Sequence, residues 1–182
     1  MKKILICGGT GFIGFNLVLY FKSKINYEVH ATYFTSKPKK LANVFWHKAD
    51  LRNTRAVDRI TKNFDIIIQA AATTSGVKDI VNKPYMHVTD NAVMNSYLMR
   101  SSFENNVKHV IFFSCTVMYQ SSNKNLKETD FNPSDKLQQK YFGVGHTKLY
   151  IEKLCKFYSE LGKTKFTVIR HSNIYGPYDK FD

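Results

Sequence analysis

A glycine-rich turn follows the apolar run Lys3–Cys7, with Gly8, Gly11 and Gly14 spaced three residues apart. Beyond the turn, apolar residues recur at helical spacing on one face: Ile13, Leu17 and Phe21. Lacking a Cβ, Gly8 permits a tight turn, Gly11 permits close approach of a phosphate, and Gly14 permits close packing of helix on strand. Backbone amides and the positive end of the helix dipole would then face a pyrophosphate. We therefore predict a dinucleotide site here; the alternative is a purely structural glycine turn.

The residues after the next predicted strand, Glu28–Thr32, indicate which dinucleotide would bind. In nicotinamide-binding folds, an acidic residue about 20 positions beyond the glycines holds the ribose 2′-hydroxyl. Residues 33–40 contain no acid, but they contain hydroxyl side chains and three lysines, the first of which is Lys37. A 2′-phosphate would be bound there more readily than a bare ribose, so we predict NADP, with NAD as the alternative cofactor. The alternative for the lysines is that they only decorate a loop.

Two further predicted strands end in residues suited to a ligand. Asp50 lies just beyond the strand Val44–His47, at the edge where ligands bind in open α/β sheets. It would accept a hydrogen bond from an adenine amino group, or instead cap the helix that begins near Thr54. The buried run Asp65–Gln69 is followed by three small residues that would keep a cleft open beside the cofactor, or simply pack closely: Ala70, Ala71 and Ala72.

A second group of reactive side chains follows the predicted strand His109–Phe113 and lies on a long helix predicted from about residue 143 to 161. The strand carries Cys115 and Thr116 at its carboxyl end, where side chains meet ligands in this kind of sheet. Lys148 falls on the predicted inward face of the helix. Because burying a lysine is costly, we expect Lys148 to have an anionic or hydroxyl partner.

Predicted strands alternate with predicted helices along the chain, which indicates an α/β fold: a Rossmann-type doubly wound parallel sheet with helices on both faces. A chain of 182 residues is long enough for one such domain, so we assign residues 1–182 to a dinucleotide-binding domain. The three cysteines lack zinc spacing, which predicts reduced thiols and no metal site. We find no apolar run of membrane-spanning length and no signal-peptide block, and therefore expect a cytoplasmic protein with no membrane partner.

The net charge of +13 is high for a chain of this length. Such a charge would suit a polyanionic partner. However, the lysines are scattered and no basic–aromatic signature of an RNA-binding module is present. We favour a solvated basic surface around an anion-binding cleft and do not expect a nucleic-acid partner, although a basic Rossmann RNA-binding protein remains an alternative.

Taken together, these residues resemble the extended short-chain dehydrogenase/reductases, specifically the NAD-dependent epimerase/dehydratase family that acts on nucleotide sugars. The landmarks occur in the family's order and spacing over essentially the whole chain: Gly8-Gly9-Thr10-Gly11-Phe12-Ile13-Gly14, Asp50-Leu51, Ala70-Ala71-Ala72, the strand ending at Ser114 with Tyr119 beyond it, Lys148, and Arg170-His171-Ser172-Asn173-Ile174-Tyr175-Gly176-Pro177. Within the family, the chain looks most like the GDP-fucose synthase-like members.

The resemblance implies roles for particular residues. The pyrophosphate would be held by Gly8, Thr10, Gly11, Phe12, Ile13 and Gly14; adenine would be flanked by Asp50 and Leu51; the nicotinamide side would be lined by Ala70, Ala71 and Ala72; and Asn173 would lie near the nucleotide-sugar phosphates. Lys148 would bind the nicotinamide ribose and lower the pKa of a catalytic tyrosine.

The catalytic tyrosine of the family lies four residues before the lysine, but this chain has Val144 there. Valine cannot move a proton. Tyr141, seven residues before Lys148, is the candidate replacement, because Gly143 and Gly145 predict a loop from which a tyrosine could reach the site.

The family's catalytic serine or threonine is also replaced in this chain. Its position is occupied by Cys115, whose thiol is a weak hydrogen-bond donor. Thr116 or Ser114 would substitute for it, or these hydroxyls would merely cap the end of the strand.

The resemblance implies an oxidoreductase of nucleotide-sugar metabolism that transfers hydride at a sugar carbon, in epimerisation, dehydration or 4-keto reduction for polysaccharide biosynthesis. Family members carry a C-terminal region that forms most of the sugar pocket, and we expect it to be absent or truncated here. That absence, with Val144 and Cys115, supports an alternative: a catalytically impaired dinucleotide-binding module. The helices holding Asn95–Phe103 and Leu149–Tyr158 are predicted faces of a homodimer, or else ordinary core.

Overall fold

The computed structural model describes residues 1–73 and 82–179. The strands within these residues are β1 (Lys2–Cys7), β2 (Tyr27–Tyr33), β3 (Val44–Lys48), β4 (Ile66–Gln69), β5 (His109–Phe113) and β6 (Lys165–Ile169). The helices are α1 (Phe12–Lys22), α2 (Thr54–Thr61), α4 (Thr89–Glu104) and α5 (Phe142–Glu160). Short 3₁₀ turns cover Pro84–His87, Glu128–Asp130 and Gln139–Tyr141.

The described strands form one parallel sheet in the order β3-β2-β1-β4-β5-β6. β1 lies near the middle, where Ile4 pairs with Val29 of β2 on one side and with Ile66 of β4 on the other. The chain moves outward from β1 to β3 and then crosses back to β4, so the strand order reverses at β1. In open α/β sheets, ligands bind at the carboxyl ends of the strands beside such a reversal. The glycine turn that follows β1 lies at that point.

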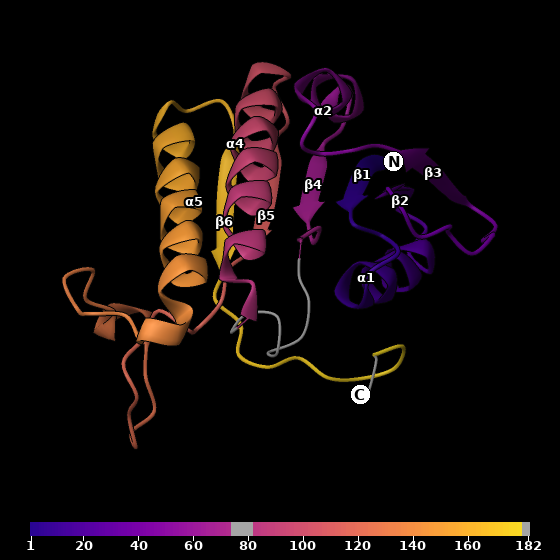
Figure 1. The fold of residues 1–182 in the computed structure, drawn as a ribbon. Helices are drawn as coiled ribbons and strands as arrows, with labels where there is room; N and C mark the ends of the chain where they lie inside the picture. The colour runs from indigo at the N-terminus through magenta and orange to yellow at the C-terminus, as the bar shows by residue number, and fades with distance from the viewer. Residues whose placement is uncertain (74–81, 180–182) are drawn as a thin grey trace.

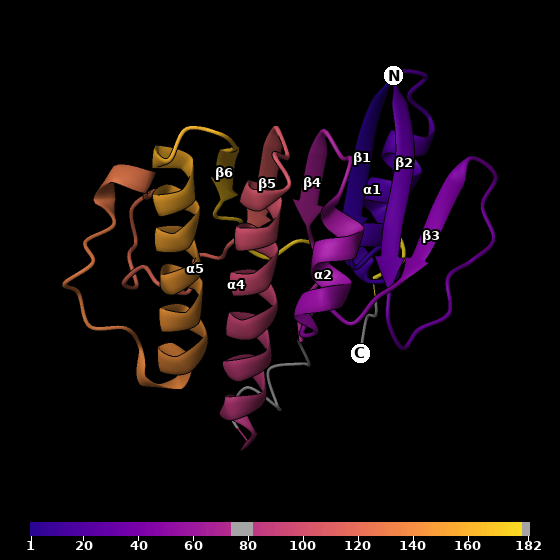
Figure 2. The same ribbon diagram turned by 90° about the horizontal axis from the view of Figure 1, so that it is seen from above.

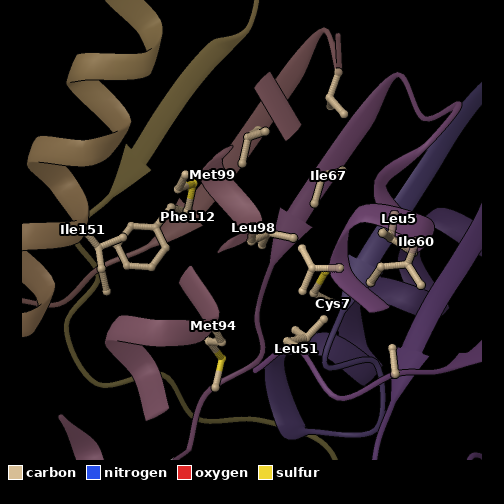
Figure 3. Close-up of a cluster of buried hydrophobic side chains, with 14 of the residues drawn as sticks. Leu5, Cys7, Leu51, Ile60, Ile67, Met94, Leu98, Met99, Phe112 and Ile151 are labelled. Carbon is tan, nitrogen blue, oxygen red and sulfur yellow. The ribbon is translucent and has the colours of Figure 1, made fainter. Parts of the chain in front are cut away.

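Helices cover both faces of the sheet (Figures 1 and 2), as predicted for a doubly wound fold. On one face α2, α4 and α5 enclose a core that includes Leu5, Ile67, Leu98, Phe112 and Ile151 (Figure 3). On the other face α1 packs against β1, β2 and neighbouring strands around a second core cluster. The strands at the middle of the sheet are therefore buried on both sides, which is why they read as continuous apolar runs in the sequence.

The predicted loop at Gly143 and Gly145 is wrong, because both glycines lie inside α5. They serve packing instead. A Cβ on Gly143 would lie 2.9 Å from Cγ2 of Val88, and a Cβ on Gly145 would lie 2.8 Å from Cδ1 of Leu137. The first turns of α5 thus require small residues for close approach, and Tyr141 lies in the 3₁₀ turn immediately before the helix.

In the part of the chain that the structure describes, no helix is long and apolar enough to cross a membrane.

Candidate functional site

The turn between β1 and α1 is built from close contacts of bare backbone. Gly8 has a φ of +75°, and a Cβ there would lie 2.6 Å from Cα of Ala71. A Cβ on Gly14 would lie only 2.1 Å from the carbonyl oxygen of Gly8. At Gly11, by contrast, a Cβ would meet only that same oxygen, at an ordinary 3.4 Å. The turn is therefore closed toward the protein at Gly8 and Gly14 and open at Gly11, which is the arrangement predicted for phosphate approach.

The amides of this turn divide into two sets. Those of Gly8, Gly9 and Gly11 donate to Oγ1 of Thr32 (2.9 Å), to the carbonyl of Thr32 (2.8 Å) and to the carbonyl of Gly8 (3.0 Å). Within the described residues, no protein acceptor bonds to the amides that remain: Thr10, Phe12, Ile13 and Gly14. The N-cap, Gly11, has no side chain that could satisfy them. These donors at the positive end of α1 fit the diphosphate of a dinucleotide.

The single tryptophan of the chain packs against the same turn. A Cβ on Gly9 would lie 2.9 Å from the ring of Trp46, which comes from β3, and 2.7 Å from Cβ of Ala31. Trp46 therefore lies directly against the turn.

Asp50 is engaged by an arginine that the sequence did not single out. Its carboxylate accepts hydrogen bonds from the backbone N, Nε and Nη2 of Arg52, each at 3.0 Å, and these bonds lower the pKa of the Asp50 carboxyl. Nη1 of Arg52 donates to Oδ2 of Asp90 at 2.9 Å. The suggestion that Asp50 caps α2 is wrong, because the N-cap is Asn53, whose Oδ1 accepts from the amide of Ala56 at 3.0 Å.

The other residues predicted at the adenosine end lie in different environments. Leu51 is only 6% exposed and belongs to the core beneath α2 (Figure 3). Lys37 is exposed. Lys39 instead lies over the rings of Phe15 and Tyr178, with its Nζ 5.4 Å from each ring centre.

The three alanines after β4 change from packed to exposed along the chain. Ala71 is half-buried against the core and against Gly8, whereas Ala72 is exposed. Ala70 is half-buried, and its amide donates to the carbonyl of Cys7 at 3.1 Å. Close packing accounts for Ala71, and the exposed Ala72 is free to line a ligand.

Lys148 is directed at the end of β5, although its partner differs from the expected anion or hydroxyl. Its Nζ donates to the backbone carbonyl of Phe113 at 2.7 Å and lies 4.7 Å from the ring centre of Phe112. Burial lowers the pKa of the Lys148 ammonium, while the Cys115 thiol and the Glu152 carboxylate act in the opposite direction. A carbonyl dipole and an aromatic face thus replace a formal counter-ion.

The candidate catalytic residues after β5 differ in how deeply they are buried. Ser114 is fully buried, and burial raises the pKa of the half-buried Cys115 thiol. Thr116 is exposed and lines a hollow of about 370 Å³ together with Tyr141. Val144 lies inside α5, one helical turn before Lys148. The structure therefore brings Thr116 and Tyr141 to one hollow and leaves an aliphatic side chain at the position of the missing phenol.

Asn173 is exposed on the segment that follows β6. This segment crosses beneath the carboxyl ends of the strands toward α1 (Figure 1). There the carbonyl of Pro177 accepts from Nδ2 of Asn16 at 2.9 Å, and the ring of Tyr178 meets that of Phe15 at 5.0 Å.

The model of the NAD dependent epimerase/dehydratase family matches residues 4–182 of this chain. Curated relatives include the GDP-L-colitose synthase of Yersinia pseudotuberculosis, 26% identical over 99% of this chain and 55% of the relative. They also include the GDP-L-fucose synthase of Azorhizobium caulinodans, 28% identical over 100% of this chain and 54% of the relative. The chain thus spans about half the length of the curated relatives it matches.

Solved structures share the fold. The UDP-glucose 4-epimerase of Thermus thermophilus, in complex with NAD, superposes with a TM-score of 0.82 at 22% identity, covering 98% of this chain and 58% of that one. A GDP-D-glycero-L-gluco-heptose synthase from Campylobacter jejuni, in the presence of NADPH, gives 0.81 at 22% identity, covering 100% and 50%. The solved structures show the shared fold, and the match of the family model to residues 4–182 shows that the chain belongs to the NAD dependent epimerase/dehydratase family, a group of NAD(P)-binding enzymes that act on nucleotide sugars.

Proposed function

We propose that this chain is the cofactor-binding domain of a nucleotide-sugar oxidoreductase that binds NADP(H) and supports hydride transfer at a sugar carbon. One observation carries the proposal: four amides without a protein acceptor among the described residues surround the open position at Gly11, where the strand order of the sheet reverses. When bound, the nicotinamide supplies or accepts the hydride. The two curated relatives described above are named as synthases of GDP-sugars, which supports a nucleotide sugar as the substrate class.

In this proposal, the residues of the chain hold and orient the reactants. The amides of Thr10, Phe12, Ile13 and Gly14 bind the diphosphate. The Lys148 ammonium has three N–H groups and donates one to the carbonyl of Phe113, which leaves two for hydroxyls of the nicotinamide ribose. Nearby hydroxyl groups would exchange the proton with the sugar oxygen.

Thr116 and Tyr141 are the hydroxyls that we assign to this step, because they line the same hollow. One hydroxyl would orient the sugar oxygen and the other would exchange a proton with it. Replacing Tyr141 with Phe removes its proton and keeps the ring, so turnover that survives this change would exclude Tyr141 from the step.

Binding of the cofactor can be tested before any substrate is known. Because Trp46 contacts the glycine turn, exciting it should transfer energy to a bound reduced nicotinamide, and titration with NADPH or NADH gives each Kd. We expect saturable transfer with both and tighter binding of NADPH. If neither dinucleotide gives transfer at millimolar concentration, the proposed function is wrong.

The preference for NADP(H) is assigned to Lys37, which is exposed in the acid-free segment after β2. The Lys37→Glu change should weaken NADPH binding and leave NADH binding nearly unaltered, because only NADPH carries the 2′-phosphate. Lys153→Glu makes the same charge change at an exposed position of α5 and is the matched control. An unchanged ratio of the two Kd values in Lys37→Glu would remove this assignment.

Val144 supports a second candidate function, a dinucleotide-binding module that does not turn over. A valine held inside α5 cannot supply the proton that a phenol would exchange one turn before Lys148. In this case the Val144→Tyr variant should gain hydride exchange that the parent chain lacks, whereas Val144→Phe, which adds the ring without the hydroxyl, should not. Turnover by the parent chain would exclude this second candidate function.

We further propose that the domain works in the cytoplasm as a homodimer joined through α4 and α5. The two helices lie side by side (Figure 2), and Tyr150 and Phe157 of α5 are about half exposed, at 47% and 52%. Sedimentation equilibrium should show a dimer that the Phe157→Glu change dissociates; a monomer at all concentrations would contradict this part.

A further inference from the structure

Arg170, the residue that follows β6, is held by three segments that lie far apart in the sequence. Its Nε donates to both carboxylate oxygens of Glu152, at 3.1 and 3.2 Å, and its Nη2 donates to Oε2 at 2.7 Å. Its Nη1 donates to the hydroxyl of Tyr119 at 2.8 Å. The guanidinium also lies 4.5 Å from the ring centre of Phe131. With side-chain exposures of 17% for Arg170 and 12% for Glu152, the ion pair is largely buried.

These contacts join the elements that carry the proposed reaction site. Glu152 lies on α5 one helical turn after Lys148, and Arg170 lies at the carboxyl end of β6. Tyr119 closes the turn after β5, where its amide donates to the carbonyl of Thr116 at 3.1 Å. Arg170 is therefore the point at which the turn bearing Thr116 is attached to the helix bearing Lys148.

The bidentate geometry explains why this residue is an arginine. Its planar fork matches both oxygens of a carboxylate and still presents an N–H to a third group, which the single ammonium of a lysine cannot do in a fixed geometry. A buried pair of this kind contributes little net stability compared with apolar packing, but breaking it leaves an uncompensated charge. The role suggested by this balance is to fix geometry.

We infer that Arg170 and Glu152 are positioning residues, whose ion pair attaches the Thr116–Tyr119 turn to α5 so that the residues after β5 stay beside Lys148. The catalytic role of the positioned residues rests on the proposed function. The attachment of the turn to α5 does not, because it can be measured without cofactor or substrate.

Cys115 provides the readout, because it lies immediately before the attached turn and is the only one of the three cysteines that is not fully buried. Burial raises the pKa of Cys7 and of Cys155 to about 12, which makes both unreactive toward alkylation in the folded chain. The thiol of Cys115 also senses nearby charges: Lys148 and Arg170 lower its pKa, and Glu152 raises it.

The first test measures alkylation of Cys115 by iodoacetamide in the folded protein at fixed pH. The Arg170→Met change should raise the rate by about tenfold or more, because local opening of the turn, without global unfolding, outweighs the loss of a positive charge that favours the Cys115 thiolate. Arg170→Lys should be alkylated as fast as Arg170→Met, because lysine keeps the positive charge but loses the planar guanidinium that binds both Glu152 and Tyr119. Arg100→Met removes an exposed pair with Glu104 on α4 (3.8 Å, 49% and 57% exposed) and should match the parent.

A second comparison separates local positioning from general loss of stability. Leu98 is fully buried in the core beneath α4 and lies outside the Arg170 contacts, so Leu98→Ala lowers global stability alone. We expect Leu98→Ala to alkylate Cys115 far more slowly than Arg170→Met does. Equal rates in these two variants, or a parental rate in Arg170→Met, would overturn the inference.

The pH profile of alkylation supplies a readout that a merely structural contact would not move. Glu152→Gln keeps the size of the side chain and one acceptor while removing its negative charge, so the midpoint of the profile should shift to lower pH. An unshifted midpoint in Glu152→Gln would show that breaking the pair changes neither the burial of Cys115 nor the charge beside it, and would contradict the inference. A failure of NADPH to bind would count against the proposed function and leave these alkylation results unaffected.

Discussion

Replacing two glycines of the same turn should separate folding from cofactor binding. Gly14→Ala places a methyl group 2.1 Å from the carbonyl oxygen of Gly8, 2.7 Å from its carbon and 3.1 Å from Cα of Gly9. All three neighbours are backbone atoms, so no side-chain rotation can relieve the overlap. Gly11→Ala places its methyl at an ordinary 3.4 Å and at φ −80°, which any residue adopts.

The magnitudes follow from these distances. Overpacking of a rigid site costs about 1–3 kcal/mol and sometimes more. Ala in place of Gly within a helix returns about 1 kcal/mol. Because a 2.1 Å contact is an extreme overlap, we expect Gly14→Ala to lose a net stability of about 2 kcal/mol or more, which in a domain of this size lowers Tm by roughly 4–8 °C. Gly11→Ala loses only the N-cap preference for glycine, about 1 kcal/mol.

Binding should show the reverse order. The methyl of Gly11→Ala occupies the open side of the turn, where the amides of α1 would meet the diphosphate. Losing one charge-assisted hydrogen bond costs about 1.5–3 kcal/mol, or roughly a 10- to 100-fold weaker Kd for NADPH. Thermal melts give the first quantity, and energy transfer from Trp46 gives the second. A parental Tm in Gly14→Ala would refute the close-packing argument, and a parental Kd in Gly11→Ala would refute the phosphate site.

Three further predictions concern the rest of the fold. Burial, and to a lesser extent the charge of His30, lower the pKa of His47 below its ordinary 6.5. Because the unfolded chain then binds the proton more readily, the free energy of unfolding should fall as the pH drops below 6.5. The His47→Gln change should flatten this pH dependence, as measured by urea unfolding at several pH values. Arg52→Met should raise the pKa of the Asp50 carboxyl, as followed by NMR titration, but change Tm by only a few degrees, because Arg52 is 40% exposed and such pairs contribute at most about 1 kcal/mol; an unchanged Asp50 pKa would contradict the observed pairing. Leu98→Ala should cost about 2–5 kcal/mol and lower Tm by roughly 4 °C or more, and a smaller loss would mean that the site collapses around the cavity.

Most of the fold was predictable because it depends on local patterns. The apolar runs that became β1, β4 and β5 lie at the middle of the sheet, where burial on both faces demands continuous hydrophobic residues. The glycine spacing predicted both the sharp turn and its open side, since the absence of a Cβ is a property of the residue and not of its surroundings. The exception was the first turn of α5, where two glycines predict a loop but lie inside the helix and pack closely against Val88 and Leu137.

The sequence by itself thus determined the order of strands and helices along the chain, the glycine turn after β1 and the absence of a tyrosine one turn before Lys148. Only the tertiary structure decided which groups meet: Lys148 with the carbonyl of Phe113, Arg52 with Asp90, and Arg170 with Glu152 and Tyr119. The physical reason is one of range. Turn geometry and helix periodicity act over a few neighbouring residues, whereas the partner of a charged side chain is set by how segments tens of residues apart pack together.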